Sequence, residues 1–231
     1  MKEGNKIVEA LIIAASIVVF GLCMKGGIDN FVNKDRKVTV KGLSEREVQA
    51  NTVTWPISTT VLGNDLSQLY NNANSTSEVI LKYLTDNGIS RDEVTINPYT
   101  VNDRNANQWS ENKSNYRYDI HVSMTVKTGK VDAVRQAFSN SGELVAKGII
   151  FDGNWVNYDY TEFQDLKIDM MKEAIKNAEE AARQFSDNSD SHLGGILQAT
   201  QGQLSIEDRD ETTPYIKKIR VVTTVTYALN D

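Results

Sequence analysis

The chain has 231 residues, of which 40% are hydrophobic and 24% are charged, and it carries 31 acidic and 25 basic side chains, 14 Gly, 3 Pro and one Cys. This composition predicts one ordinary globular domain or two small ones. The formal charge of -6 argues against a nucleic-acid-binding protein, because phosphate contacts need clustered Lys and Arg. A single Cys excludes an intramolecular disulfide, and two His argue against a His-rich metal site or a His-based catalytic triad.

An apolar segment stands near the start of the chain, at residues 7–24, and only Glu9 and Ser16 interrupt it. The run from Ala10 to Met24 forms a helix of about 22 Å, which is shorter than a hydrocarbon core of about 30 Å. A span therefore needs the two preceding apolar residues as well. We predict a transmembrane helix over residues 7–24, within an N-terminal signal anchor that occupies residues 1–27.

The flanks of this segment decide how it is processed and oriented. No small residues follow the run at the spacing of a signal-peptide cleavage site, and Leu22 before Cys23 disfavours lipidation. Lysines on both sides leave the positive-inside rule undecided. The one Cys lies inside the segment, so the rest of the chain after it contains no thiol. For this reason we predict a single-pass protein of the inner (cytoplasmic) membrane, with its main domain in the periplasm or outside the cell. Residues 28–36 are then a linker, and a buried core helix is the alternative.

The linker leads into two predicted strands. Residues 37–42 alternate apolar and polar side chains, as a strand with one buried face does. Residues 48–62 form a long strand candidate whose apolar phase changes between Ala50 and Val53, which indicates a bulge. Pro56 places this strand toward a sheet edge.

A first long helix follows. Asn64 can cap its start, and Asn87 and Gly88 end it. Its predicted apolar stripe consists of Leu66, Leu69, Tyr70, Ala73, Ser77, Ile80, Leu81 and Leu84. A strand is predicted at residues 93–101, and residues 102–115, which are nearly devoid of aliphatic side chains, predict a solvated loop at a hairpin tip.

The clearest strand of the chain is at residues 116–126. Its even-numbered positions, from Tyr116 to Val126, are apolar and its odd-numbered ones are polar, which is typical of an antiparallel sheet with one wet face. A short helix at residues 131–138 and a strand at residues 147–152 complete this half.

A second long helix opens with Thr161 and Gln164, at the spacing of a capping box. Its predicted stripe consists of Leu166, Met170, Met171, Ala174, Ile175, Ala178, Ala181, Ala182 and Phe185. Strands at residues 196–206 and 216–229 follow, joined by an acidic loop. The predicted fold class is therefore α+β, with antiparallel sheet packed against two long amphipathic helices and one short helix, in one domain over residues 37–231.

The two halves share a plan of a long helix, a Gly-Ile pair and a hairpin. Four of the seven positions in IHVSMTV, which starts at Ile120, are identical in IRVVTTV, which starts at Ile219. This suggests an internal duplication of a helix-plus-hairpin unit. Strand alternation alone also makes such matches easy, so the duplication is a hypothesis.

Several segments occur in an order that resembles a known family: VTVKG from Val38, DNGISRDEVTINPYTV from Asp86, YDIHVSMTVKTGKVDAVRQAF from Tyr118, GIIF from Gly148, KEAIKNAEEAARQF from Lys172 and the closing IRVVTTVTYAL. Together they resemble the SIMPL-domain family, which includes the bacterial periplasmic immunogenic proteins. After Gly42 the chain departs from the usual pattern. The resemblance implies an α+β extracytoplasmic domain that oligomerises in some members, an envelope or stress-related role, and no established catalytic residues.

The chain contains none of the common catalytic, nucleotide-binding or metal-binding motifs. His121 lies on the polar phase of its strand, as a solvated sheet residue does. His192 stands near Asp187 and Asp190, which can hold a cation weakly or belong to a mobile turn. The acidic segment 207–211 indicates a solvated tip, and a metal site is the alternative. We therefore predict no catalytic, cofactor-binding or metal-binding residue, and no cofactor.

Aromatic side chains supply the candidate interface residues. Trp155, Tyr158 and Tyr160 cluster between a strand and a helix, where they form a ligand platform, a subunit contact or a packed connector. Trp55 and Ile57 share one phase of the strand that contains Pro56. An apolar edge strand of this kind is a pairing hazard unless a second copy covers it, so these residues predict a homo-oligomer.

The leading functional hypothesis is a membrane-tethered, extracytoplasmic, non-enzymatic protein that acts in the cell envelope by self-assembly or by binding an envelope protein partner. A binding module for a small molecule or a cell-wall fragment is the alternative, and it needs a concave pocket lined with aromatic side chains. A hydrolase that uses carboxylates is a third hypothesis, and it needs an Asp or Glu pair with raised pKa values in a cleft.

Overall fold

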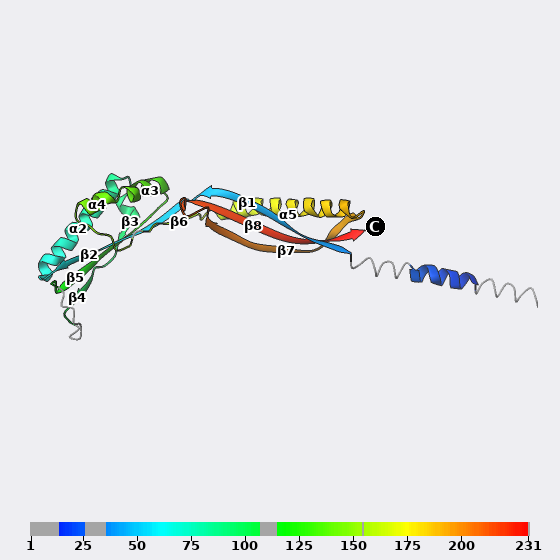
Figure 1. Cartoon of the computed structure of the whole chain (residues 1–231), viewed down its shortest axis with the longest axis horizontal. Coiled ribbons are helices and arrows are strands. Elements are labelled where there is room, and N and C mark those ends of the chain that lie inside the picture. Colours follow the sequence, from blue (N-terminus) through cyan, green and yellow to red (C-terminus); the bar gives the residue numbers. More distant parts are fainter. Residues whose placement is uncertain (1–13, 26–35, 107–114, 154, 231) are drawn as a thin grey trace, which may run out of the picture. The chain divides into compact units, whose positions relative to one another are not determined.

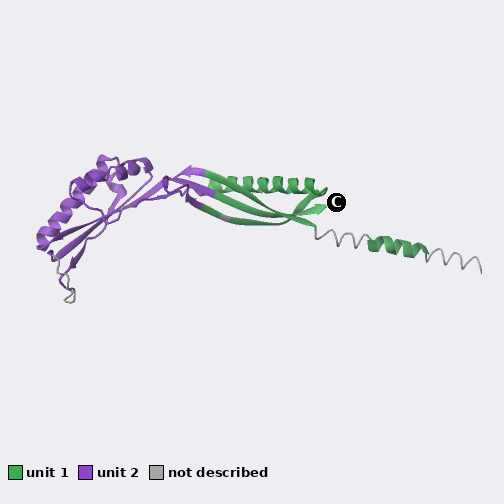
Figure 2. Cartoon of the chain, viewed as in Figure 1, with its two compact units in different colours: residues 1–46, 164–205, 220–231 green, residues 47–163, 206–219 purple. Residues whose placement is uncertain are grey.

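The computed structural model describes residues 14–25, 36–106, 115–153 and 155–230 (Figure 1). The chain divides into two compact units (Figure 2). Unit 1 consists of Met1–Arg46, Gln164–Ser205 and Arg220–Asp231, and unit 2 consists of Glu47–Phe163 and Ile206–Ile219. Where the sequence predicted one domain over residues 37–231, the structure has two units, with most of unit 2 inserted between β1 and the long helix of unit 1.

Unit 2 contains an antiparallel sheet in the order β3-β5-β2-β6, with β4 also paired to β5. Its strands are β2 (Thr52–Gly63), β3 (Val94–Ile96), β4 (Thr100–Asp103), β5 (Tyr118–Thr128) and β6 (Asn157–Asp159). The central pair, β2 and β5, runs in register from Val53 opposite Thr128 to Gly63 opposite Tyr118. The α+β class with antiparallel sheets is confirmed.

Strand β5 confirms the predicted alternation. Its buried side chains include Ile120, Val122, Met124 and Val126, and its polar side chains lie on the other face. The strand begins two residues later than predicted, and Tyr116 is exposed before it.

Three helices belong to unit 2: α2 (Leu66–Asp86), α3 (Val131–Ser139) and α4 (Gly142–Ala146). The cap of α2 is Asp65, whose Oδ1 accepts from Gln68 N at 2.8 Å. The predicted cap, Asn64, instead accepts from Arg117 N at 2.8 Å. At the other end Gly88 has φ +86°, a left-handed conformation that suits the residue after a helix.

Two predicted strands of unit 2 differ in the structure. The long segment 48–62 is broken at Ala50, so that β1 (Lys37–Gln49) ends and β2 begins where we predicted a bulge. The predicted strand at residues 93–101 is split into β3 and β4. Pro98 lies in this gap, and its missing N–H removes a donor from the ladder. Residues 107–114 of the predicted loop lie outside the described residues.

The predicted strand at residues 147–152 is wrong. The segment before it forms α4, and Gly148 with φ +83° follows that helix. Only one isolated bridge remains, between Phe151 and Thr59 of β2. Since Asp152 N donates to Ser58 O, the segment follows the edge of β2 without forming a ladder.

The β2 strand also corrects the predicted interface. Only residues 52–54 of β2 pair with β6, so the β6 side of β2 is not paired with that strand at Pro56. This agrees with the preference of Pro for a sheet edge. Trp55 and Ile57, however, are only 2% and 1% exposed and belong to the core of unit 2. The Trp55 ring meets the Phe138 ring of α3 edge to face at 5.7 Å. The hypothesis that these two side chains form an uncovered apolar edge is therefore wrong, because the unit's own helices cover that face.

Unit 1 contains a three-stranded sheet in the order β1-β8-β7, with β7 (His192–Asp208) and β8 (Ile216–Asn230). At one end Leu229 N donates to Arg36 O at 2.9 Å, and further along the hydroxyls of Thr39 and Thr226 lie 3.0 Å apart. Residue numbers rise along β1 as they fall along β8, so these two strands are antiparallel.

The long helix α5 (Phe163–Asn188) packs on β1 and β8 in unit 1. Its buried residues recur every fourth position: Met170, Ala174, Ala178, Ala182 and Ser186. The predicted stripe was too wide, because Ile175 is 41% exposed and Phe185 is also exposed. A Cβ atom on Gly42 of β1 would lie 1.8 Å from Ala174 O. Helix and strand thus approach so closely that only small side chains fit between them.

Both units share one topology. The sheet of unit 1 has the order β1-β8-β7, around the long helix that follows β1 in the same unit. In unit 2 the strands β2, β5 and β3 are neighbours in the corresponding order, and β4 and β6 are added to them. The matched strands also bury equivalent residues, such as Ile120 with Ile219 and Val126 with Val225. The structure supports the duplication hypothesis.

At the N-terminus the structure describes a helix over residues 14–25. The remainder of the predicted span, residues 7–13, and residues 28–35 of the predicted linker lie outside the described residues. Among the helices that are described, none is both long enough and apolar enough to cross a membrane.

Candidate binding site

A concave site in unit 2 gathers aromatic side chains from three parts of the chain. We call it the aromatic pocket. It has a volume of about 450 Å³ and is lined by Arg135, Phe138, Ser139, Trp155, Val156, Tyr158, Glu211, Thr212, Pro214 and Tyr215. Helix α3, the segment around β6 and the tip between β7 and β8 each contribute to it.

The aromatic rings of the pocket differ in accessibility. The rings of Tyr158 and Tyr215 meet edge to face at 6.2 Å. Tyr158 is buried, and burial raises the pKa of its phenol, although the nearby Arg135 charge opposes this rise. Trp155, by contrast, is 59% exposed. Tyr158 therefore forms a neutral wall, whereas Trp155 offers an accessible ring.

Arg135 joins α3 to the tip. Its Cζ lies 3.6 Å from the centroid of the Tyr215 ring, and its Nη1 donates to Asp132 Oδ1 at 2.9 Å. Asp132 stands in the first turn of α3, where the helix dipole favours a negative charge. The ion pair and the ring contact together fix the plane of the guanidinium.

The tip itself is braced by Asp210. Its carboxylate accepts from the backbone N–H groups of Thr212 and Thr213 at 2.9 and 2.8 Å and from both threonine hydroxyls at 2.6 Å. With Arg209, these donors hold the pKa of Asp210 well below its usual range. Glu211 and Thr212 are thereby fixed at the rim of the pocket. Within the described ranges, no three His, Cys, Asp or Glu side chains gather as a metal site would require.

A second depression, of about 410 Å³, shares Arg135 and Tyr215 with the aromatic pocket. Its other lining residues are Glu47, Val48, Gln49, Asp132 and Ile216. The stacked pair of Arg135 and Tyr215 thus separates two adjoining hollows of unit 2.

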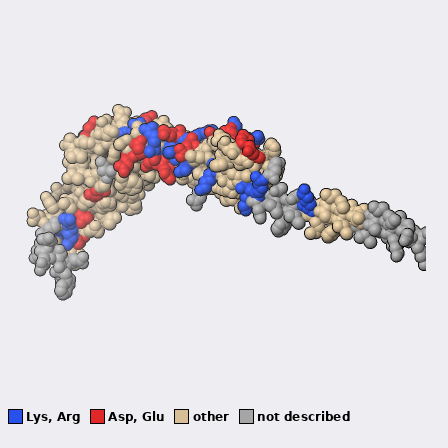
Figure 3. Space-filling view, turned by 45° about the vertical axis from the view of Figure 1, so that its right-hand side comes forward, with Lys and Arg blue, Asp and Glu red and all other residues tan. Residues whose placement is uncertain are grey.

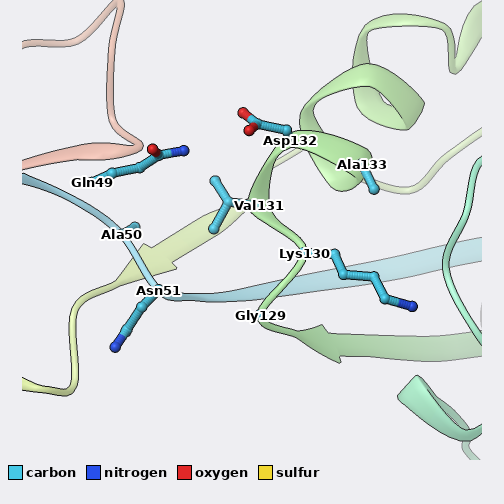
Figure 4. Close-up of a pocket in the computed structure, with 8 residues that line it drawn as sticks. All are labelled: Gln49, Ala50, Asn51, Gly129, Lys130, Val131, Asp132 and Ala133. Atoms are coloured by element: carbon cyan, nitrogen blue, oxygen red, sulfur yellow. The ribbon is translucent and has the colours of Figure 1, made fainter.

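A third depression, of about 440 Å³, lies at the start of α3 (Figure 4). Gln49 and Asp132 approach it from two sides, whereas Lys130 points away. Lys130 Nζ donates to Glu93 Oε2 at 2.9 Å and to Ser90 Oγ at 3.0 Å, and Asn51 Oδ1 accepts from Thr161 N at 3.0 Å. These polar groups hold the fold together, so this depression offers little chemistry for a ligand.

The sheet of unit 2 carries one polar cluster on its solvent side. His121 Nδ1 lies 3.6 Å from Asp152 Oδ2, and Thr60 Oγ1 donates to the same oxygen at 2.6 Å. The His121 side chain is partly exposed, which agrees with its interpretation as a solvated sheet residue. His192 is exposed at the start of β7.

A family model described as SIMPL, protein of unknown function (DUF541), matches residues 38–227. The chain belongs to the SIMPL family. No curated protein matches it. The matched range begins in β1 and ends in β8, so the SIMPL region contains the sheets and long helices of both units.

In this SIMPL protein the predicted aromatic cluster is only partly assembled into one site. Trp155 and Tyr158 line the aromatic pocket, whereas Tyr160 is half-buried and does not line it. Sequence reasoning missed Arg135 and Tyr215. Tyr215 follows Pro214 after an acidic tip, but nothing in the sequence indicates that this tip lies beside α3.

Proposed function

We propose that this SIMPL protein is a membrane-tethered, non-enzymatic protein of the cell envelope that acts by self-assembly through β7. One observation carries the proposal. Among the described strands, β7 stands at the edge of the unit 1 sheet and pairs with β8 alone, and residues 195–201 are exposed at every position. Because successive side chains of a strand point to opposite faces, both faces of this edge are open.

The exposed edge is uncharged and carries two large apolar side chains. Ile196 and Leu197 are 56% and 57% exposed. Natural edge strands are usually blunted by charged side chains or by Pro. Residues 193–206 contain no charged residue and no Pro. Addition of a second β7 would satisfy the free backbone groups of this edge and cover both side chains.

The small core of unit 1 supports the same proposal. That core consists of Val40, Ala178, Ala182, Val225 and Tyr227, and two of its five members are alanines. Meanwhile Leu43, Ile168 and Ile175 remain exposed on β1 and α5. Apolar burial stabilises by about 25 cal/mol per Å², so a second copy offers unit 1 stabilisation that its own helix does not supply.

The proposed tether is residues 7–24, which would anchor the chain in the inner membrane with both units in the periplasm or outside the cell. The described helix of residues 14–25 carries no charge before Lys25. Confinement to a membrane raises the effective concentration of neighbouring copies, so that even a weak edge contact forms. The envelope or stress-related setting is what the family resemblance implies.

Cysteine cross-linking in native membranes tests the proposal. In a Cys23→Ser background, Gln198→Cys and Thr200→Cys each place one thiol on β7. If two β7 strands pair antiparallel, a short bis-maleimide reagent should give a cross-linked dimer with at least one of these variants. Lys82→Cys, on the solvent side of α2, is the matched control and should stay monomeric. The absence of a dimer from both β7 variants, or equal cross-linking of the control, would contradict the proposal.

A binding module is the second candidate function. A module of this kind needs a concave, largely apolar pocket with a few polar groups. The aromatic pocket combines the rings of Trp155, Tyr158 and Tyr215 with Arg135 and Glu211, and this combination favours the candidate.

A further inference from the structure

We propose that the aromatic pocket binds a neutral carbohydrate chain, with Trp155 as the ring on which one sugar stacks. The inference rests on the binding-module candidate and is independent of self-assembly through β7. Three properties of the pocket suit this ligand class: an accessible ring, paired donors and acceptors, and near-neutral charge.

The accessible ring comes from Trp155. An indole that is 59% exposed beside the half-buried Pro214 and Tyr215 leaves a large apolar face in water. A pyranose ring has one face of C–H groups whose hydrogens carry partial positive charge. The negative face of an aromatic ring attracts such groups, and stacking removes both surfaces from water.

The polar groups suit hydroxyls. Within the described part of the chain, Asp132 is the one hydrogen-bond partner of the Arg135 guanidinium, which leaves further N–H donors for a ligand. Glu211 and Ser139 also line the pocket, where Glu211 supplies acceptors and Ser139 supplies a hydroxyl. A sugar hydroxyl both donates and accepts, so neighbouring hydroxyls can engage a guanidinium and a carboxylate at once.

The charge of the pocket does not suit a polyanion, because Arg135 is the one cation among the residues that line it. Arg135 is balanced by Asp132, and Glu211 adds one further negative charge. In the view of Figure 3, acidic and basic side chains lie beside one another in the middle of the picture. A polyanion needs clustered positive charge, whereas a neutral polymer does not.

The pocket is also pre-organised. Asp210 fixes the tip through four hydrogen bonds from Thr212 and Thr213, and the contact with Tyr215 fixes Arg135. A ligand that binds a rigid site pays little for ordering it. Because the second depression shares Arg135 and Tyr215, a chain of several sugars can extend past this pair into that hollow. Affinity should therefore rise with chain length.

Titration calorimetry on the full chain tests this inference. The protein is held in a polyoxyethylene ether detergent, because a detergent with a sugar headgroup would compete. The probes are oligomers of N-acetylglucosamine and of glucose, from dimer to hexamer. At least one series should bind saturably, with affinity that increases about tenfold from dimer to hexamer.

Two variants assign the binding to the pocket. Trp155→Ala should weaken hexamer binding at least about tenfold, and Arg135→Lys, which keeps the charge but loses the planar fork, should weaken it similarly. Tyr70→Ala removes an exposed aromatic ring of α2 and should leave binding unchanged. Thermal unfolding of Trp155→Ala should match the parent, since the side chain is largely exposed.

The source of the sugar is distinguished by a second arm, in which the protein is sedimented with purified cell-wall sacculi. If the protein co-sediments with sacculi and Trp155→Ala does not, the source is a wall polymer. If the protein binds soluble oligomers but does not co-sediment with sacculi, the source is a free glycan. The proposal is overturned if no oligomer binds at about 10 mM, if Trp155→Ala binds like the parent, or if a proline-rich peptide binds the pocket while sugars do not. The β7 cross-linking, repeated on the same variant, reports on self-assembly separately.

Discussion

Glu93 ties its own turn at residues 90–93 to residues 128–130 of unit 2 through its carboxylate. It accepts from Thr128 Oγ1 at 2.6 Å, from Ser90 N at 2.7 Å and from Lys130 Nζ at 2.9 Å. Partial burial alone would raise the pKa of this carboxyl, but the three donors outweigh burial and lower it from 4.5 to about 2. The carboxylate thus stays ionised well below the usual range of Glu.

We predict that this site makes unit 2 sensitive to acid. Because the pKa is lower in the folded state, the unfolded chain takes up the proton first as the pH falls. The stabilisation is complete above pH 4.5 and is lost as the pH falls to about 2. We expect it to be worth about 1 to 2 kcal/mol after allowance for solvent screening. Urea unfolding at several pH values measures this.

Glu93→Gln is the variant that isolates the effect. At neutral pH the variant should be less stable than the parent. In acid the parent loses the stabilisation from its carboxylate, so the stability of the two proteins should become nearly equal. Glu78→Gln, on the exposed side of α2, should keep the pH dependence of the parent. If Glu93→Gln kept the full acid dependence, the carboxylate would not be its source.

Residue by residue, the sequence predicts which side chains share a face better than it predicts what covers that face. Alternation placed Trp55 and Ile57 correctly on one side of a strand. Whether α3 or a second copy covered them depends on contacts between distant segments, such as Trp55 with Phe138. Arg135 and Tyr215 were missed for the same reason, since 80 residues separate them in the chain.

Among the elements, α5 and β1 make the closest approach. Every fourth residue of α5 from Met170 to Ser186 is buried. Two of these buried residues, Ala174 and Ala178, lie directly over Gly42. A helix that sits this near a strand contacts it along a narrow stripe. For this reason Ile175, which fits a wider amphipathic stripe, lies in solvent.

We predict that Gly42→Ala destabilises the protein by about 3 kcal/mol. Its Cβ would lie 1.8 Å from Ala174 O and 2.6 Å from Ala178 N, and backbone atoms can yield only if the helix moves. Gly142→Ala is the control, because no atom lies within 4 Å of its added Cβ, and its stability should change by less than about 0.5 kcal/mol. Equal effects in urea unfolding would mean that α5 does not approach β1 this closely.

Elements with a clear periodic pattern could be predicted, including the short helix α3, whereas the strand predicted at residues 147–152 was wrong. The helices α2 and α5 and the strands β5, β7 and β8 were expected close to their observed bounds. The segment 147–152 has the composition of a strand, but Gly148 near its start adopts a left-handed φ of +83° just after α4. A single backbone turn thus outweighed local strand preference, and no pattern in the sequence announces it.

At the scale of the whole molecule, the chain contains one topology twice. Unit 2 is inserted into unit 1, so β1 is separated by more than 100 residues from the helix that covers it. The repeated helix and hairpin could be recognised in the sequence, but two separate cores could not, since hydrophobic periodicity does not say which helix covers which sheet. The two cores are unequal: Leu193 of β7 packs against the small core of unit 1, but residues 195–201 of the same strand stay exposed.

Sedimentation velocity of the full chain in density-matched detergent tests whether the protein self-assembles through β7. The parent should sediment as a dimer or larger assembly across the concentration range. The double variant Ile196→Lys, Leu197→Lys places a charge on each face of the edge and should sediment as a folded monomer with an unchanged circular dichroism spectrum. A parent that stays monomeric at every concentration, or a variant that assembles like the parent, would contradict the account.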